Sequence, residues 1–278
     1  MPGTRRLYPT DLTDAEWALL EPLLERRDGR GRPPKRPRRL IADAVFHLLR
    51  SGCTWRPLPR EYPPWRTVHT QFRRWRTGGT LHAAHEELRR PVRAAEGRSP
   101  EPSAAILDSQ TVKGAGVGGP ARGHDGARRA KGRKRHLLVD TLGLVLPAHV
   151  HAADLPDRAG ARLLLGAAGR DALPRLGLVW ADAAYAGGFA DQLAAERGWR
   201  LEVPRHPDRQ LWRYGLEEKP RKAFRVPPRR RVVERTFAWL GQSRRLGRDY
   251  EHLPHTGETM IYAAMSRIML RRLARLNA

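Results

Sequence analysis

The stretch AAILDSQTV, residues 104–112, places one carboxylate, Asp108, inside an otherwise apolar run. The run has the length of a strand and is followed by a glycine-rich segment, so it predicts a buried β-strand. An ionised carboxylate in a buried strand costs several kcal/mol unless it is paired or binds a metal. The stretch therefore predicts both a sheet and a functional site on that sheet.

The sequence that follows this strand alternates between strand and helix patterns. Residues 136–152 predict two strands that turn at Thr141 to Gly143. The order then continues as helix, strand, helix, strand and helix, over residues 157–169, 176–182, 188–198, 199–205 and 232–251. This order predicts an α/β fold with a mixed sheet flanked by helices.

The N-terminal third of the sequence predicts helices only. The first helix opens with a capping box, Thr13 and Glu16, and the second, residues 40–52, ends at the C-cap candidate Gly52. A third helix is predicted within residues 63–79 and carries several arginines. Three short helices with basic residues on the last resemble a helix-turn-helix module, and the alternative is a plain helical bundle with solvated arginines.

A change in composition separates the two parts of the chain. Proline, charged and small residues are mixed in residues 89–104, a pattern typical of a boundary between domains. We therefore expect an N-terminal helical DNA-binding domain at residues 1–90, a linker at 91–103 and a catalytic domain at 104–278.

The composition is strongly basic. The 53 Lys and Arg residues outnumber the 29 Asp and Glu residues, which gives a formal charge of +24 and a pI near 11.5. The positive side chains of such a protein repel one another unless an anionic partner neutralises them, and the usual partner is a nucleic acid. A GC-rich genome is the second explanation for the arginine excess, and both explanations stay open at this point.

Cysteine content and hydropathy indicate the compartment. The one cysteine, Cys53, excludes an intramolecular disulfide and a cysteine-based zinc site. The first residues show charge without the apolar core of a signal peptide, and the longest apolar runs fall far short of the roughly 18 residues that a membrane span needs. We expect a soluble, cytoplasmic protein of a bacterium, with no membrane partner.

Three carboxylates lie at positions where a site would assemble. Asp108 interrupts one strand, Asp182 ends another, and Glu234 lies near the start of the helix predicted at 232–251. The residue four positions after Glu234 is Ala238, so no base lies where a helix would best pair this acid. Clustered carboxylates suit Mg²⁺ or Mn²⁺, and two such ions about 3.5–4 Å apart promote phosphodiester displacement. The alternatives are a solvated acid at Asp108, a turn-forming cap at Asp182 and a helix-dipole acid at Glu234.

A basic run and a histidine pair accompany these acids. In the basic run at residues 127–136, we expect contacts with the DNA backbone from Lys131, Arg133, Lys134 and Arg135. The alternative is that these charges are only solvated. His149 and His151 share one face of a predicted strand, which is compatible with zinc. Hydrogen bonding is the better interpretation of this pair, because no third strong ligand is evident.

Five stretches together carry a resemblance to a known family: LTDAEWALLEPLL, ILDSQTVKG, GRKRHLLVDTLGLVL with VHAAD, VWADAAYAG, and RRRVVERTFAWLGQSRRLGRDYE. They span almost the whole chain and resemble, in the same order, the insertion-sequence DDE transposases of the IS four/five-type group. The resemblance implies an RNase H-like catalytic domain in which Asp108, Asp182 and Glu234 are the catalytic, metal-binding triad. It also implies Mg²⁺ or Mn²⁺ as the cofactor, with two ions in the site.

The signature around the third acid of that family is only partly present. Arg230 fits the signature, whereas Pro227 stands where many relatives have tyrosine and Gly241 where they have lysine. Arg244 and Arg245 could supply the missing charge from the next turn. We therefore expect Arg230, Arg244 and Arg245 to contact DNA.

The resemblance implies a transposase that binds the terminal inverted repeats of its own element, cleaves DNA and joins it to target DNA. Two DNA ends must meet, so a homodimer or a larger synaptic assembly is expected, associated with the nucleoid when bound to DNA. Two alternatives stay open. One is a non-catalytic DNA-binding protein derived from such an element, and the other is a structure-directed nuclease of the same fold.

Overall fold

The computed structural model describes residues 6–24, 36–167, 172–203 and 230–276. The strands of this part form one six-stranded mixed sheet, in which β1 pairs antiparallel with β3 and parallel with β5. β2 and β4 pair antiparallel with β3, and β6 pairs parallel with β5. The strands are β1 (Ala104–Lys113), β2 (Gly123–Asp125), β3 (Ala130–Asp140), β4 (Val145–Ala152), β5 (Leu178–Trp180) and β6 (Arg200–Glu202).

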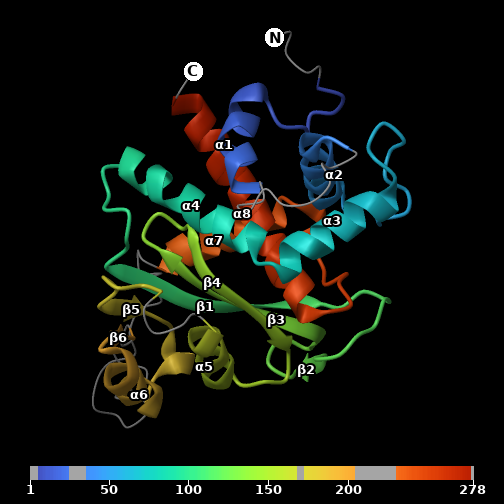
Figure 1. The fold of residues 1–278 in the computed structure, drawn as a ribbon. Coiled ribbons are helices and arrows are strands. Elements are labelled where there is room, and N and C mark those ends of the chain that lie inside the picture. The colour runs from blue at the N-terminus through green and yellow to red at the C-terminus, as the bar shows by residue number, and fades with distance from the viewer. Residues whose placement is uncertain (1–5, 25–35, 168–171, 204–229, 277–278) are drawn as a thin grey trace, which may run out of the picture.

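Helices cover both faces of this sheet (Figure 1). α5 (Asp157–Ala167) and α6 (Gly188–Arg197) lie below it in Figure 1, whereas α7 (Arg230–Gly241) and α8 (Pro254–Leu276) lie above it with the N-terminal helices. The side chains of β1 alternate between the two layers, since Leu107 packs with the α5 and α6 core and Ile106 with the α7 and α8 core. The predicted mixed sheet flanked by helices is confirmed, with the strand order expected of an RNase H-like fold.

The N-terminal helices begin and end where their capping residues indicate. The helices are α1 (Asp14–Leu24), α2 (Arg38–Ser51), α3 (Trp65–Thr77) and α4 (Thr80–Ala95). The Thr13 hydroxyl accepts from the Glu16 N–H at 3.1 Å, and the Glu16 carboxylate accepts from the Thr13 N–H at 2.7 Å, which is the predicted capping box. Gly52 ends α2 with a φ of 74°, as its C-cap role requires.

α4 extends further than the sequence pattern indicates. It runs through the first five residues of the linker predicted at 91–103 and includes Pro91. Its buried apolar stripe, at Leu81, Ala84, Leu88 and Val92, continues past the proline at helical spacing, and this packing outweighs the missing N–H. The linker prediction is therefore wrong for residues 91–95. The division at residues 1–90 and 104–278 stays a prediction, and both parts contribute to one hydrophobic core.

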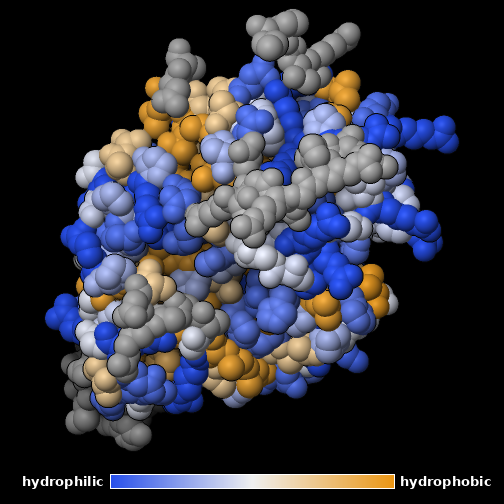
Figure 2. Space-filling model, viewed as in Figure 1, coloured by the Kyte–Doolittle hydropathy of each residue, from blue (hydrophilic) through white to orange (hydrophobic). Residues whose placement is uncertain are grey.

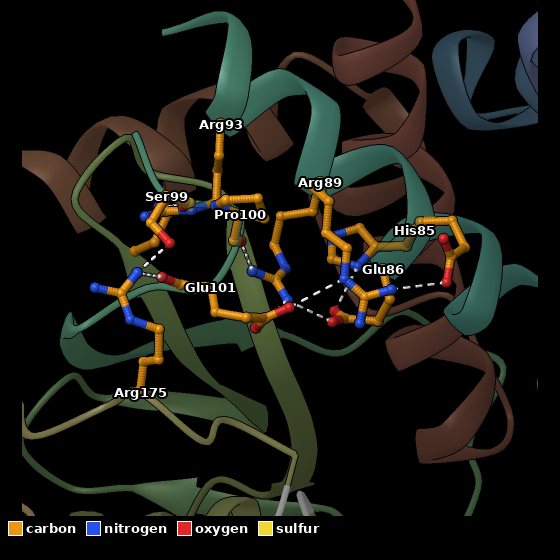
Figure 3. A network of polar contacts seen from close by, with 11 residues as sticks. His85, Glu86, Arg89, Arg93, Ser99, Pro100, Glu101 and Arg175 are labelled. Atoms are coloured by element: carbon orange, nitrogen blue, oxygen red, sulfur yellow. Dashed lines mark hydrogen bonds and ion pairs between the residues drawn. The ribbon is translucent and has the colours of Figure 1, made fainter. Parts of the chain in front are cut away.

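A network of arginines and carboxylates fastens α4 to the residues that lead into the sheet (Figure 3). The Arg89 guanidinium is fully buried, donates to Glu86 at 2.7 Å and lies 3.6 Å from Glu101. Arg93 donates to the Ser99 carbonyl oxygen and forms a buried ion pair with Asp140 at the end of β3. Asp140 also accepts from the backbone of the turn between β3 and β4, so its role is structural.

The single helix predicted at 232–251 is two shorter elements. α7 ends at Gly241, and a 3₁₀ turn, η3 (Arg244–Leu246), follows it. The apolar stripe of Val233, Phe237 and Leu240 stops there, so no buried face extends the helix. None of the described helices has the length and apolar character that crossing a bilayer requires.

Candidate active site

Asp108 and Asp182 come from neighbouring parallel strands. β1 and β5 pair with Ile106 opposite Trp180, and each aspartate lies two residues beyond this pair. Adjacent strands lie about 4.8 Å apart, and the carboxyl ends of parallel strands are where binding sites assemble. The structure thus brings two of the three predicted acids to matching positions on one edge of the sheet.

Backbone donors fix both carboxylates locally. Asp108 accepts from the Ser109 N–H at 2.7 Å, and Asp182 accepts from the Ala184 N–H at 2.9 Å. Asp182 is therefore the N-cap of a short 3₁₀ turn, η1 (Ala183–Tyr185). Both side chains are half-buried. The capping role proposed as an alternative for Asp182 is present, and it orients the carboxylate without excluding a catalytic role.

Glu234 lies on the same side of the sheet as Asp108. Even-numbered residues of β1 share a face, so Asp108 is on the face of Ile106, which packs in one core with Val233 and Phe237 of α7. α7 lies against β1 and β3. Glu234 follows Val233 and is exposed. The third acid is thus carried by the helix that covers the face of Asp108.

The carboxylate oxygens of these acids are the ligand type that Mg²⁺ and Mn²⁺ prefer. Within the described ranges, no three His, Cys, Asp or Glu side chains are grouped closely enough to hold a metal ion. Mg²⁺ needs less than that, because one or two protein carboxylates hold it together with waters and substrate phosphates. Asp108 on β1 and Asp182 just after the neighbouring strand β5 supply two such carboxylates and fit this requirement.

The basic run on β3 is folded inward. Arg133 is 0% exposed, Arg135 is 4% exposed and Lys134 is buried, because β3 lies inside the sheet. Arg133 donates to the carbonyl oxygens of Glu251 and His252, each at 2.8 Å, and pairs with the Asp249 carboxylate at 2.9 Å. The prediction that these side chains contact DNA phosphates is wrong for this structure.

The other two members of the buried group are also used internally. Arg135 donates to the Leu246 carbonyl oxygen at 2.6 Å, and Lys134 pairs with Asp157 at 3.0 Å. Lys131, at the start of the same strand, is exposed. Contact between Lys131 and DNA stays a prediction.

The arginines after α7 have different environments. Arg245 is buried and donates to Glu251 at 2.7 Å, so the prediction that it contacts DNA is wrong, whereas Arg244 is exposed and its contact stays a prediction. Pro227 and the Arg230 side chain lie outside the described residues. Three contacts form what we call the α2–α7 junction: Arg50 donates to the Gln242 carbonyl oxygen, Arg245 donates to the Cys53 carbonyl oxygen, and Gly52 packs against Arg244.

The histidine pair is hydrogen-bonded, as the preferred interpretation of the sequence has it. His149 lies 3.1 Å from the Glu258 carboxylate, and His151 contacts His136 at 2.7 Å. Two residues near the acids escaped the sequence analysis, His136 on β3 and Ser109 next to Asp108. The sequence offered one signal for Ser109: it directly follows Asp108, a candidate metal ligand, in the same predicted strand.

Two protein-family models match the chain. Residues 99–269, more than half of the chain, match a protein-family model described as "Transposase DDE domain". Residues 12–85 match a second model described as "Putative transposase of IS4/5 family". Among curated proteins, none matches the chain. The chain therefore belongs to the DDE transposases of insertion sequences, with N-terminal helices of the IS4/5 type.

Proposed function

We propose that this transposase binds the terminal inverted repeats of its element, cleaves the DNA at the element's end and joins that end to target DNA. The observation that carries the proposal is that Asp108 and Asp182 each follow the paired residues Ile106 and Trp180 of β1 and β5 by two positions. Glu234, on the helix that covers the Asp108 face, would complete the triad. The membership of the DDE family supports this assignment.

The chain's own residues would orient the reaction. Asp108 and Asp182 present carboxylate oxygens beside a phosphodiester, and the backbone donors from Ser109 and Ala184 hold those carboxylates in place. Mg²⁺ or Mn²⁺ ions, when bound, activate the attacking oxygen and neutralise charge in the transition state. Water first cleaves the bond at the end of the element, and the freed 3′-hydroxyl then attacks a phosphodiester of the target.

A basic surface over the N-terminal helices supports DNA binding. Arg66, Arg73 and Arg74 are exposed on α3, the last helix of the predicted helix-turn-helix-like module. Figure 2 shows hydrophilic side chains over the region where α3 lies. The formal charge of +24 gives such a surface a strong attraction to phosphates. Because two ends must meet before strand transfer, we expect a dimer or a larger assembly.

The test uses the full chain, DNA that carries the element's end, and Mg²⁺. Asp108→Asn and Glu234→Gln should bind this DNA with wild-type affinity and lose cleavage on the order of a thousandfold. Glu21→Gln, which changes an exposed glutamate on α1, is the matched control and should cleave as the wild type does. Chelation of Mg²⁺ should stop cleavage and leave binding intact.

Three results would overturn the proposal. Wild-type cleavage by the Asp108 and Glu234 variants would remove their catalytic assignment. End-specific binding without any cleavage by the wild-type chain would favour a DNA-binding protein derived from a transposase. Cleavage that follows DNA structure and ignores the end sequence would favour the nuclease alternative.

A further inference from the structure

Asp182 lies just past the last backbone pairing that could hold it. β5 ends at Trp180, and the Ala181 N–H donates to the Glu202 carbonyl oxygen at 3.2 Å. Beyond Ala181 the chain enters the η1 turn, and none of the described strands pairs with that turn. The Ala184 N–H of this turn orients the Asp182 carboxylate, so the position of the turn sets the position of the carboxylate. The buried side chain that ends the turn is Tyr185.

Tyr185 ends η1 and is 1% exposed. Its phenol oxygen lies 3.0 Å from Nε2 of His136 on β3. His136 is the β3 residue paired with Ser109 of β1, so the tyrosine reaches across the strand that carries Asp108. One hydrogen bond thus links the Asp182 turn to a strand on the far side of β1.

Tyr185, His136, His151 and the Ala152 carbonyl oxygen form a series of hydrogen bonds. The carbonyl oxygen at its end fixes which group donates in each bond. His151 Nδ1 lies 2.8 Å from the Ala152 carbonyl oxygen, which can only accept, so Nδ1 carries a proton. In the neutral ring Nε2 then accepts, and His136 Nδ1 donates to it at 2.7 Å. His136 Nε2 is left as an acceptor, so the Tyr185 O–H donates. Burial lowers the pKa of His136 to about 3 and lowers that of His151, which keeps both rings neutral.

Helix α5 is shaped around this histidine pair. Gly160 of α5 faces the two rings, and a Cβ there would lie 2.4 Å from His151 Nε2 and 2.5 Å from His136 Cε1. Glycine is unfavourable inside a helix, so its presence at the closest approach to the rings indicates that the space is needed. The two rings, on β3 and β4, are therefore packed closely against α5 and have little room to move.

The charges of nearby carboxylates act on the Tyr185 phenol. Burial raises the pKa of Tyr185, and the negative charges of Asp108, Asp157 and Asp182 raise it further. The Tyr185 O–H therefore stays protonated and available as a donor. Ser109, whose N–H donates to Asp108, also interacts with the phenol through its hydroxyl.

We propose that Tyr185 is a positioning residue for the divalent-ion site. Through the bond to His136 it fixes the η1 turn, and through that turn it holds the Asp182 carboxylate level with Asp108. This inference rests on the proposed catalytic role of the two aspartates. Tyr185 itself touches neither DNA nor an ion, since its side chain is buried on the α5 side of the sheet.

The test replaces Tyr185 with Phe, which removes one oxygen and keeps the ring. We expect the half-saturating Mg²⁺ concentration for cleavage to rise about tenfold or more, as it does when a supporting partner of a metal ligand is lost. DNA affinity measured without divalent ions should equal that of the wild type. A Mn²⁺ titration of the protein–DNA complex, followed by electron paramagnetic resonance, should show the same weakening without reference to activity.

The matched control is Tyr262→Phe. The Tyr262 hydroxyl is also buried, and it accepts from the Ala148 N–H of β4 at 2.9 Å, so its loss removes a comparable bond in the core on the other face of the sheet from Tyr185. This variant should keep the wild-type Mg²⁺ and Mn²⁺ response. Gly160→Ala, which crowds the histidine pair from the other side, should shift the metal response in the same direction as Tyr185→Phe.

The outcomes separate this inference from the proposed function. If Asp182→Asn cleaves like the wild type, the proposed site itself is wrong. If Asp182→Asn loses cleavage while Tyr185→Phe and Gly160→Ala keep the wild-type Mn²⁺ affinity, the positioning role alone is wrong. An equal loss of Mn²⁺ affinity in Tyr262→Phe would show a general effect of destabilisation and would also overturn it.

Discussion

Two cations on β3, Lys131 and Arg133, show how far position decides the role of a charged side chain. Lys131 lies at the exposed start of the strand, whereas Arg133 lies two residues later and is fully buried. The Arg133 guanidinium satisfies its donors with four carbonyl oxygens and the Asp249 carboxylate. A buried guanidinium with this many partners stabilises the fold and cannot reach a phosphate.

The first prediction separates these two roles. Arg133→Met leaves the Asp249 carboxylate buried without its charge partner, so the free energy of unfolding should fall by about 3–5 kcal/mol. Lys131→Ala should leave that free energy unchanged and should reduce the slope of DNA affinity against salt by about one phosphate contact. Urea unfolding and binding at several salt concentrations measure the two effects. A reduced salt slope in a fully stable Arg133→Met variant would contradict the assignment.

For single residues, the sequence predicts contacts between near neighbours in the chain and misses contacts between residues far apart in it. The capping box of Thr13 and Glu16 follows from three residues of spacing and is confirmed. A basic run reads the same whether its charges face water or the interior, so the burial of Arg135 could not be predicted. The partner of Tyr185 lies 49 residues earlier in the chain, and no local pattern indicates it.

Among the elements, the contact between the end of α2 and the η3 turn leaves no room for a side chain. Gly52 and Gly198 both end a helix with positive φ, at 74° and 69°. A Cβ on Gly52 would lie 2.9 Å from the Arg244 Cβ, whereas a Cβ on Gly198 would meet no heavy atom within 4 Å. Alanine substitutions at these two glycines therefore separate the free-energy cost of a left-handed backbone from the cost of a steric clash.

The second prediction uses this difference. Gly198→Ala should lower the free energy of unfolding by about 1–2 kcal/mol, the cost of a left-handed conformation for alanine. Gly52→Ala should lower it by that amount and by a further 1–3 kcal/mol or so for overpacking against Arg244. Urea unfolding of both variants gives the comparison. Equal losses would mean that α2 and η3 are not in tight contact.

Element order was more predictable than element length. Alternating apolar patterns predict β1, β3, β4 and the helices between the strands. The end of α7 at Gly241 was missed because the residues after it remain compatible with a helix, and only the loss of a buried face stops it. The extension of α4 past Pro91 was missed for the converse reason, since its buried stripe outweighs a local breaker.

For the whole molecule, the shared core and the α4 network join the N-terminal helices to the sheet. Side chains of α1 to α4 belong to the same apolar cluster as those of β1, β3, β4, α7 and α8. Arg93 adds a buried ion pair between α4 and Asp140. We therefore expect the helices and the sheet to unfold together.

The third prediction tests this cooperativity. Arg93→Leu leaves Asp140 buried without its charge partner, so it should destabilise the fold by about 3–5 kcal/mol. Hydrogen exchange should show the same loss of protection in α2 and in β1. Arg90→Leu, on the same helix, removes ion pairs of a half-exposed arginine and should cost no more than about 1 kcal/mol. A loss confined to α4 and its neighbouring helices would show that the two parts unfold separately.

The α2–α7 junction couples the position of α2 to the position of the segment that follows α7. It joins the end of α2 directly to the turn that follows the helix of Glu234, without passing through the sheet. In the proposed complex, DNA binds the N-terminal helices, and a displacement of α2 there would move the η3 turn with it. Such a displacement would reach the segment next to the helix of Glu234 without crossing the sheet.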